Sequence, residues 1–295
     1  MKTSADRQRL ETMNQTNQEI AVSVQPTNTR KEIAAFLGLT FGASVLLYSL
    51  ILTSKSPAEG QRFIPELMWA PGLSALATRL IFYRTLRGLG WGWPGLRWAA
   101  LACLLPIAYA TVAYGVVWLT GLGGYDLSRF KDNPLLFVLV GLIVSLVLAA
   151  GEEIGWRGFL VPALARTMSL GRVALVSGAI WVVYHAPLIL FGEYNASGNP
   201  KWYSMLCFTV MAMSVALMLA WLRLRTGSLW PAAILHAAHN LAIQGFFDRV
   251  TVDTGSTRWL TGEFGAALAV TTGVAAWMFW RTRGQVTVRD ENNPA

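Results

Sequence analysis

Two adjacent carboxylates follow a long apolar stretch, in the run Gly151-Glu152-Glu153-Ile154-Gly155-Trp156-Arg157. The stretch 134–151 contains no charged residue. Charged side chains are rare in lipid and usually face a protein interior or a water-filled cavity, where they mark function. If the helix continues, Glu153 and Arg157 lie four residues apart and can pair, which leaves Glu152 free as a general base. The alternative is that the helix ends here and both carboxylates lie among lipid headgroups.

All three histidines of the chain lie in or beside apolar stretches. His185 is followed closely by Pro187, which disturbs a helix and can open its backbone near the imidazole. His236 and Asn240 are four residues apart and share a helical face, whereas His239 is offset around the helix. A single membrane histidine commonly forms a hydrogen bond between helices. A carboxylate, imidazoles and an amide together, however, are the groups that activate water and stabilise an oxyanion.

Composition places the chain among polytopic membrane proteins. Of its 295 residues, 54% are hydrophobic and 14% are charged, with a mean hydropathy of +0.44, whereas soluble domains carry about 25% charged residues. The net charge of +8 is explained by Lys and Arg on the cytoplasmic side, without a nucleic-acid partner. Cys103 and Cys207 lie in apolar stretches, as expected of free thiols and not of a disulfide framework.

The elements that must position these residues are apolar stretches long enough to cross a bilayer core of about 30 Å. We expect an all-α bundle of about eight transmembrane helices in a single domain, residues 31–283. A polar arm (1–30), expected to be disordered and cytosolic, precedes it, and a polar cytosolic tail (284–295) follows. The expected spans are 33–54, 63–83, 98–121, 134–154, 172–191, 202–222, 228–247 and 262–281.

The distribution of Lys and Arg predicts the orientation. Seventeen of the 24 Lys and Arg fall on the side of both termini and seven on the other side, and positive charge marks the cytoplasm. We therefore expect an integral protein of the plasma (bacterial inner) membrane with both termini and the mouth of the site in the cytoplasm. The boundaries predict a difference in depth, since Glu152 would end its span while His185 lies roughly 20 Å deep in the next. A common site requires the fourth span to continue beyond residue 154.

Three motifs in order resemble one known family. They are Glu152-Glu153-x-x-x-Arg157, then an aromatic residue four before His185, then His236-x-x-x-Asn240. The pattern is similar to the CPBP family (CAAX proteases and bacteriocin-processing proteins, also called Abi), which includes the type II CAAX prenyl endopeptidases. The resemblance extends over the second to seventh spans, including Trp69-Ala70-Pro71 and Ser228-Leu229-Trp230-Pro231-Ala232. Trp181 stands where the family commonly has Phe, and we expect this to change packing and not to abolish activity.

The resemblance implies a role for each residue. Glu152 would activate water, His185 would help to hold that water, and Glu153 with Arg157 would form a structural pair. The oxyanion would be stabilised by His236 and Asn240. His239 matches no catalytic position and is interpreted as a helix-packing residue. Members are usually named metalloproteases, so a bound metal and a metal-free glutamate mechanism both stay open. If a metal binds, the ligands would be Glu152, His185 and His236, a set that suits Zn²⁺.

Three functions follow as hypotheses. The first is an intramembrane endopeptidase that cleaves a membrane-associated peptide or protein, which in this family can be prenylated. The second is a non-catalytic immunity or adaptor protein that keeps the fold. The third is a proton-coupled transporter, because buried Glu, His and Arg also build proton relays. The expected partners are the lipid bilayer and a peptide or protein substrate, with no nucleic acid.

Overall fold

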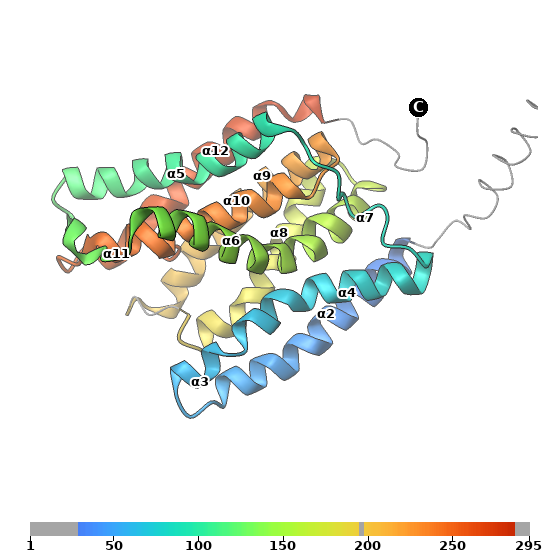
Figure 1. Ribbon diagram of the computed structural model, residues 1–295, viewed down its shortest axis with the longest axis horizontal. Coiled ribbons are helices and arrows are strands. Elements are labelled where there is room, and N and C mark those ends of the chain that lie inside the picture. The colour runs from blue at the N-terminus through green and yellow to red at the C-terminus, as the bar shows by residue number, and fades with distance from the viewer. Residues whose placement is uncertain (1–28, 195–197, 287–295) are drawn as a thin grey trace, which may run out of the picture.

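Helices packed side by side form almost the whole molecule (Figure 1). The structure is a computed structural model that describes residues 29–194 and 198–286. Its longer helices are α2 (Thr29–Leu52), α4 (Ile64–Tyr83), α5 (Leu96–Leu119), α6 (Pro134–Glu153), α8 (Leu170–Leu190), α9 (Lys201–Thr226), α10 (Trp230–Asn240) and α12 (Ala266–Arg281). Residues 1–28 of the predicted arm and residues 287–295 of the predicted tail lie outside the described part of the chain.

The predicted fold class, a helical membrane bundle, is confirmed. Five described helical segments are long and apolar enough to cross a membrane: α2, α5, the segment Pro134–Ala165, α8 and α9. Helices α4, α10 and α12 occupy the other predicted spans. The number of membrane crossings and the position of the termini stay predictions.

The fourth span is much longer than predicted. Helix α6 continues without a break into a π-helix, η2 (Ile154–Leu160), and then into α7 (Val161–Ala165), giving a segment of 32 residues. We call this segment the α6–α7 rod; at about 1.5 Å per residue it is roughly 48 Å long. The expected end at residue 154 is wrong because Arg157 is neutralised inside the protein and does not have to reach water.

This extension brings the predicted site residues to one depth. Glu152 lies roughly 20 Å from the end of the rod at Ala165, and His185 lies roughly 22 Å from the start of α8 at Leu170, at the same end of the bundle. The expected difference in depth between Glu152 and His185 is therefore absent from the structure. Glu152 is a residue of the middle of the membrane-spanning rod.

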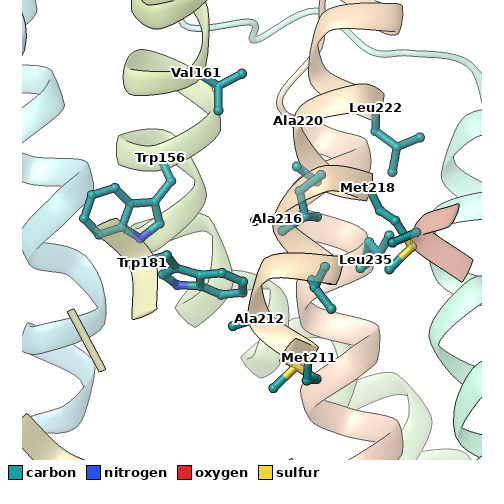
Figure 2. Close-up of a cluster of buried hydrophobic side chains, with 14 of the residues drawn as sticks. Trp156, Val161, Trp181, Met211, Ala212, Ala216, Met218, Ala220, Leu222 and Leu235 are labelled. Carbon is teal, nitrogen blue, oxygen red and sulfur yellow. The ribbon is translucent and has the colours of Figure 1, made fainter. Parts of the chain in front are cut away.

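The bundle centres on α9, whose most apolar window is 61% buried, whereas that of the α6–α7 rod is 17% buried. Figure 2 shows Met211, Ala212 and Ala216 of α9 packed near Trp181 of α8. The first two-thirds of the rod instead present large apolar side chains outwards, including Leu139 and Ile143, as expected for contact with lipid. The rod is thus a peripheral helix whose last third turns into the protein.

The connections gather at two ends of the bundle (Figure 1). The end where α2 begins and α12 stops, here called the terminal end, also holds the connections 84–95, 166–169 and 227–229. The opposite end holds the connections after α2, α5, α8 and α10, with the short helices α3 (Pro57–Gln61) and α11 (Asp248–Val250). A two-stranded antiparallel sheet there pairs β1 (Gly124–Tyr125) with β2 (Thr251–Val252), a small departure from the expected all-α structure.

Helix α4 crosses the rod where both helices lack side chains. A Cβ on Gly72 would lie 2.4 Å from the carbonyl oxygen of Gly151, and a Cβ on Gly155 would lie 2.5 Å from the Cβ of Pro71. Small residues allow helix backbones to approach closely in membranes. The residues Trp69-Ala70-Pro71, noted in the sequence, form this crossing and fix the rod next to Glu152.

We expect Gly72→Ala to destabilise the protein by about 1–3 kcal/mol, because the added methyl group overpacks the crossing. The matched control is Gly42→Ala in α2, where a Cβ would have nothing within 4 Å. Thermal unfolding in detergent micelles should show a lower midpoint for Gly72→Ala and an unchanged or higher midpoint for the control. Equal midpoints for the two variants would show that the crossing is not tight.

Candidate active site

Glu152 is almost completely enclosed, with 2% of its surface exposed. Two indole groups donate to its Oε2 atom: Trp156 Nε1 at 3.2 Å and Trp181 Nε1 at 2.8 Å. Figure 2 shows the Trp181 ring just below the Trp156 ring. Hydrogen bonds to an ionised acceptor are stronger than neutral ones, so the two indoles stabilise the carboxylate form. Because both bonds go to Oε2, Oε1 is the oxygen that can accept a proton from bound water.

Glu153 points about 100° around the rod from Glu152 and binds two partners through one oxygen. Its Oε1 accepts from Arg157 Nη1 at 2.8 Å and from His236 Nδ1 at 3.0 Å. The predicted pair of Glu153 and Arg157 is therefore present, and both side chains are fully buried. The bond to His236 was not expected: it links the rod to α10 and fixes the orientation of the imidazole.

Trp181 holds the parts of the site together. Besides its bond to Glu152, its ring lies 5.6 Å from the ring of His185 and 5.5 Å from that of His236, centroid to centroid. The guanidinium of Arg157 lies 4.6 Å above the same ring, a cation–π geometry. The sequence suggested a packing role for this aromatic residue. The structure adds a hydrogen-bond donor to Glu152 that a Phe could not supply.

His185 is oriented by its own helix. Its Nδ1 lies 2.9 Å from the carbonyl oxygen of Trp181, and a carbonyl can only accept, so Nδ1 carries the proton and Nε2 is the free acceptor. The neighbouring Tyr184 anchors α8 to α4 by donating to the carbonyl of Leu67 at 2.7 Å. Ser44 of α2 donates to the Tyr184 hydroxyl at 3.1 Å. Helices α2, α4 and α8 are thereby locked beside the imidazole.

The start of α10 is fixed by the connection between α4 and α5. The amide of Leu229 donates to the carbonyl of Gly90 at 2.8 Å, and Trp230 Nε1 donates to the carbonyl of Trp91 at 2.8 Å. Ser228 Oγ accepts from the amide of Trp230 at 3.2 Å. These contacts give a structural role to Ser228, Leu229 and Trp230 in the motif noted in the sequence. They set the helical register that turns His236 and Asn240 inwards.

One cavity of about 1090 Å³ contains the predicted site residues. Glu152, His185, His236 and Asn240, which come from the rod, α8 and α10, all line it. A cavity of this volume exceeds the usual range for drug-sized ligands, roughly 300–1,000 Å³, and can accept several residues of a peptide. The arrangement places a general base, two imidazoles and an amide around one volume.

His239 also lines the cavity, and its partners were missed from the sequence. Its Nδ1 lies 2.5 Å from the hydroxyl of Tyr109, and its Nε2 lies 3.1 Å from Glu263 Oε1. Glu263 Oε2 in turn accepts from Tyr194 at 2.6 Å. Both ring nitrogens are engaged, which agrees with the packing role predicted for His239. No spacing rule connects Glu263 to His239, because Glu263 lies in the connection before α12.

A metal ion in this site would need several donor side chains that converge on one point. Within residues 29–194 and 198–286, no three His, Cys, Asp or Glu side chains are arranged so that they could hold one. The hydrogen bonds of both Nδ1 atoms and of Glu152 Oε2 leave the two Nε2 atoms and Oε1 available, so it is the placement of the three side chains, and not their bonding, that does not suit a metal. The set Glu152, His185 and His236 therefore does not fit a metal in this conformation.

We expect Arg157→Met to destabilise the protein by about 3–5 kcal/mol, because it leaves the buried charge of Glu153 without its cation. The double variant Glu153→Gln with Arg157→Met removes both charges and should recover part of that loss. Unfolding midpoints in detergent, compared across wild type, both single variants and the double variant, measure the coupling. Purely additive losses would mean that the pair contributes no interaction energy.

Comparison with known proteins was consistent with this geometry. Residues 134–242 match the family described as type II CAAX prenyl endopeptidase Rce1-like, a segment that contains Glu152, His185, His236 and Asn240. The CAAX prenyl protease 2 of Methanococcus maripaludis is 30% identical over 123 residues, which cover 40% of this chain and 42% of that protein. The chain thus matches less than half the length of this curated relative. These findings confirm the resemblance predicted from the motifs: the segment that carries the site is similar to the Rce1-like type II CAAX prenyl endopeptidases.

Proposed function

We propose that the protein is an intramembrane endopeptidase, similar to CAAX proteases, that hydrolyses a peptide bond of a membrane-associated protein or peptide. The observation that carries the proposal is the enclosed carboxylate of Glu152, held by two indole donors in a cavity shared with His185, His236 and Asn240. The family match supports the reaction class. Prenylated substrates are named for the relatives and are one candidate class here.

The residues suggest the following reaction. Water between Glu152 and His185 Nε2 loses a proton to the carboxylate as its oxygen attacks the scissile carbonyl carbon. The tetrahedral oxyanion accepts hydrogen bonds from the Asn240 amide and from His236. As the C–N bond breaks, Glu152 returns the proton to the leaving amine. General acid–base catalysis of this kind contributes about 10²–10⁴-fold.

The charges around His236 support its role as an oxyanion donor. Its Nδ1 faces Glu153, so Nε2 can donate only when the ring is an imidazolium. Ionised Glu152, ionised Glu153 and Arg157 together carry one negative charge, which an imidazolium would neutralise. Glu153 is thus proposed to serve both Arg157 and His236, and to act on the reaction through His236.

A transporter is less well supported. The residues that line the cavity come from the middle of the bundle and from the end opposite the termini. Among the described residues, the lining includes none from the connections 84–95, 166–169 or 227–229 of the terminal end. A transport path would have to be lined through both ends. The cavity therefore resembles a reaction chamber with one entrance, in a protein that we place in the plasma membrane.

Glu152→Gln should abolish cleavage, with a loss of at least about 100-fold in rate, because an amide cannot accept the proton of water. Asn240→Ala should lower kcat by about 10²–10³-fold, as removal of one oxyanion donor does in other hydrolases. The measurement is the rate of cleavage of a fluorogenic prenylated peptide and of the proteins in a membrane extract. The control is Glu66→Gln, an exposed glutamate of α4 outside the cavity. Wild-type turnover by Glu152→Gln would refute the mechanism.

We further propose that the reaction follows the glutamate route, since the three candidate ligands do not fit a metal. Purified protein should contain much less than one equivalent of zinc by elemental analysis. Cleavage should survive dialysis against 1,10-phenanthroline. Loss of activity that added Zn²⁺ restores, together with stoichiometric zinc in the untreated protein, would show that the metal route is used.

A further inference from the structure

The cavity opens at the end of the bundle opposite the termini. Its lining includes Lys55 in the connection after α2, Glu193 in the connection after α8, and Asp253 and Arg258 in the connection before α12. All four residues are exposed to solvent. They form the rim of the cavity, and Glu152 lies at its inner part. A polypeptide that enters the cavity from water must therefore pass this rim.

The terminal end is closed over the same site. Leu89 is fully buried, and the connection that carries it is bonded to the start of α10 through Gly90 and Trp91. Arg223 of α9 donates through Nε to the carbonyl of Arg157 at 2.9 Å. A Cβ on Gly90 would lie 2.9 Å from the Arg223 guanidinium carbon, so this layer is tightly packed. It separates Glu153 and Arg157 from the terminal end.

The charge distribution assigns a side of the membrane to each end. Seventeen of the 24 Lys and Arg belong to the terminal side in the sequence, and Arg157 leaves that group because it lies inside the bundle. Sixteen against seven is still a strong bias. By the positive-inside rule, the terminal end faces the cytoplasm. The predictions of cytoplasmic termini and of a cytoplasmic mouth exclude each other in this structure, because the two lie at opposite ends.

We propose that substrate reaches Glu152 from the extracytoplasmic face. The substrate class is then a membrane-anchored or translocated polypeptide whose cleaved segment lies outside the cytoplasm. The direction of access follows from the rim, the closed end and the charge bias. That the entering polypeptide is a substrate rests on the proposed function. The side from which the cavity is reached does not, because access can be measured without cleavage.

The experiment uses single cysteines in the full-length chain. In a background of Cys103→Ala and Cys207→Ala, which removes both native cysteines, Glu193→Cys and Arg258→Cys report on the rim. Trp93→Cys and Arg172→Cys are exposed positions at the terminal end and serve as matched controls. Spheroplasts are treated with a sulfonated maleimide that does not cross membranes, before and after permeabilisation.

The rim cysteines should react in intact spheroplasts, and the terminal-end cysteines should react only after permeabilisation. Rim cysteines that react only after permeabilisation overturn the proposal. The same labelling pattern is expected in a Glu152→Gln background. Failure of the access proposal is therefore distinguishable from failure of the proposed function, which cleavage assays test separately. In active protein, modification of Arg258→Cys from outside should also slow cleavage of a substrate that is added from outside.

Discussion

Two adjacent carboxylates in the middle of a membrane-spanning rod are the constraint on which the rest of the structure depends. Adjacent helical residues point in different directions, so Glu152 and Glu153 need separate partners. Arg157 and His236 bind Glu153, and the indoles of Trp156 and Trp181 bind Glu152. Each partner comes from the rod itself or from a helix packed beside it. The positions of α8 and α10 are therefore tied to the electrostatics of one turn of the rod.

The packing around that turn follows from the same requirement. Helix α4 can cover the rod beside the carboxylates only if its backbone touches the backbone of the rod, which Gly72 and Gly151 allow. Closure of the terminal end by the connection through Gly90 keeps water from the Glu153–Arg157 pair. Exclusion of water strengthens each charge interaction inside. The tight crossing, the closed end and the buried pair therefore support one another.

Much of this was predictable from the sequence, and the failures have physical causes. Apolar length predicted the helices, and the spacing of four predicted that Glu153 meets Arg157 and that His236 and Asn240 share a face. The end of the fourth span was misplaced because charge was assumed to mark the membrane surface, whereas Arg157 is neutralised internally. The indole donors of Trp156 and Trp181 were missed because aromatic residues in membrane helices usually pack. Glu263 could not be linked to His239 because a long-range contact leaves no periodic signal.

The two π-helices also limit how the chain can change. The π-helix η2 (Ile154–Leu160) directly follows Glu153, and a second, η3 (Leu241–Phe247), directly follows Asn240. A π-helix closes its hydrogen bonds over five residues instead of four and so holds more residues per turn than an α-helix. Loss of one residue from η2 could restore regular α-helix there, and because the wider turn absorbs that extra residue, the helix after it would keep nearly the same rotation relative to Glu152. The extra residue therefore changes the backbone only beside Glu153 and Asn240, and a single-residue deletion in either π-helix should disturb the site locally while the rest of each helix keeps its packing.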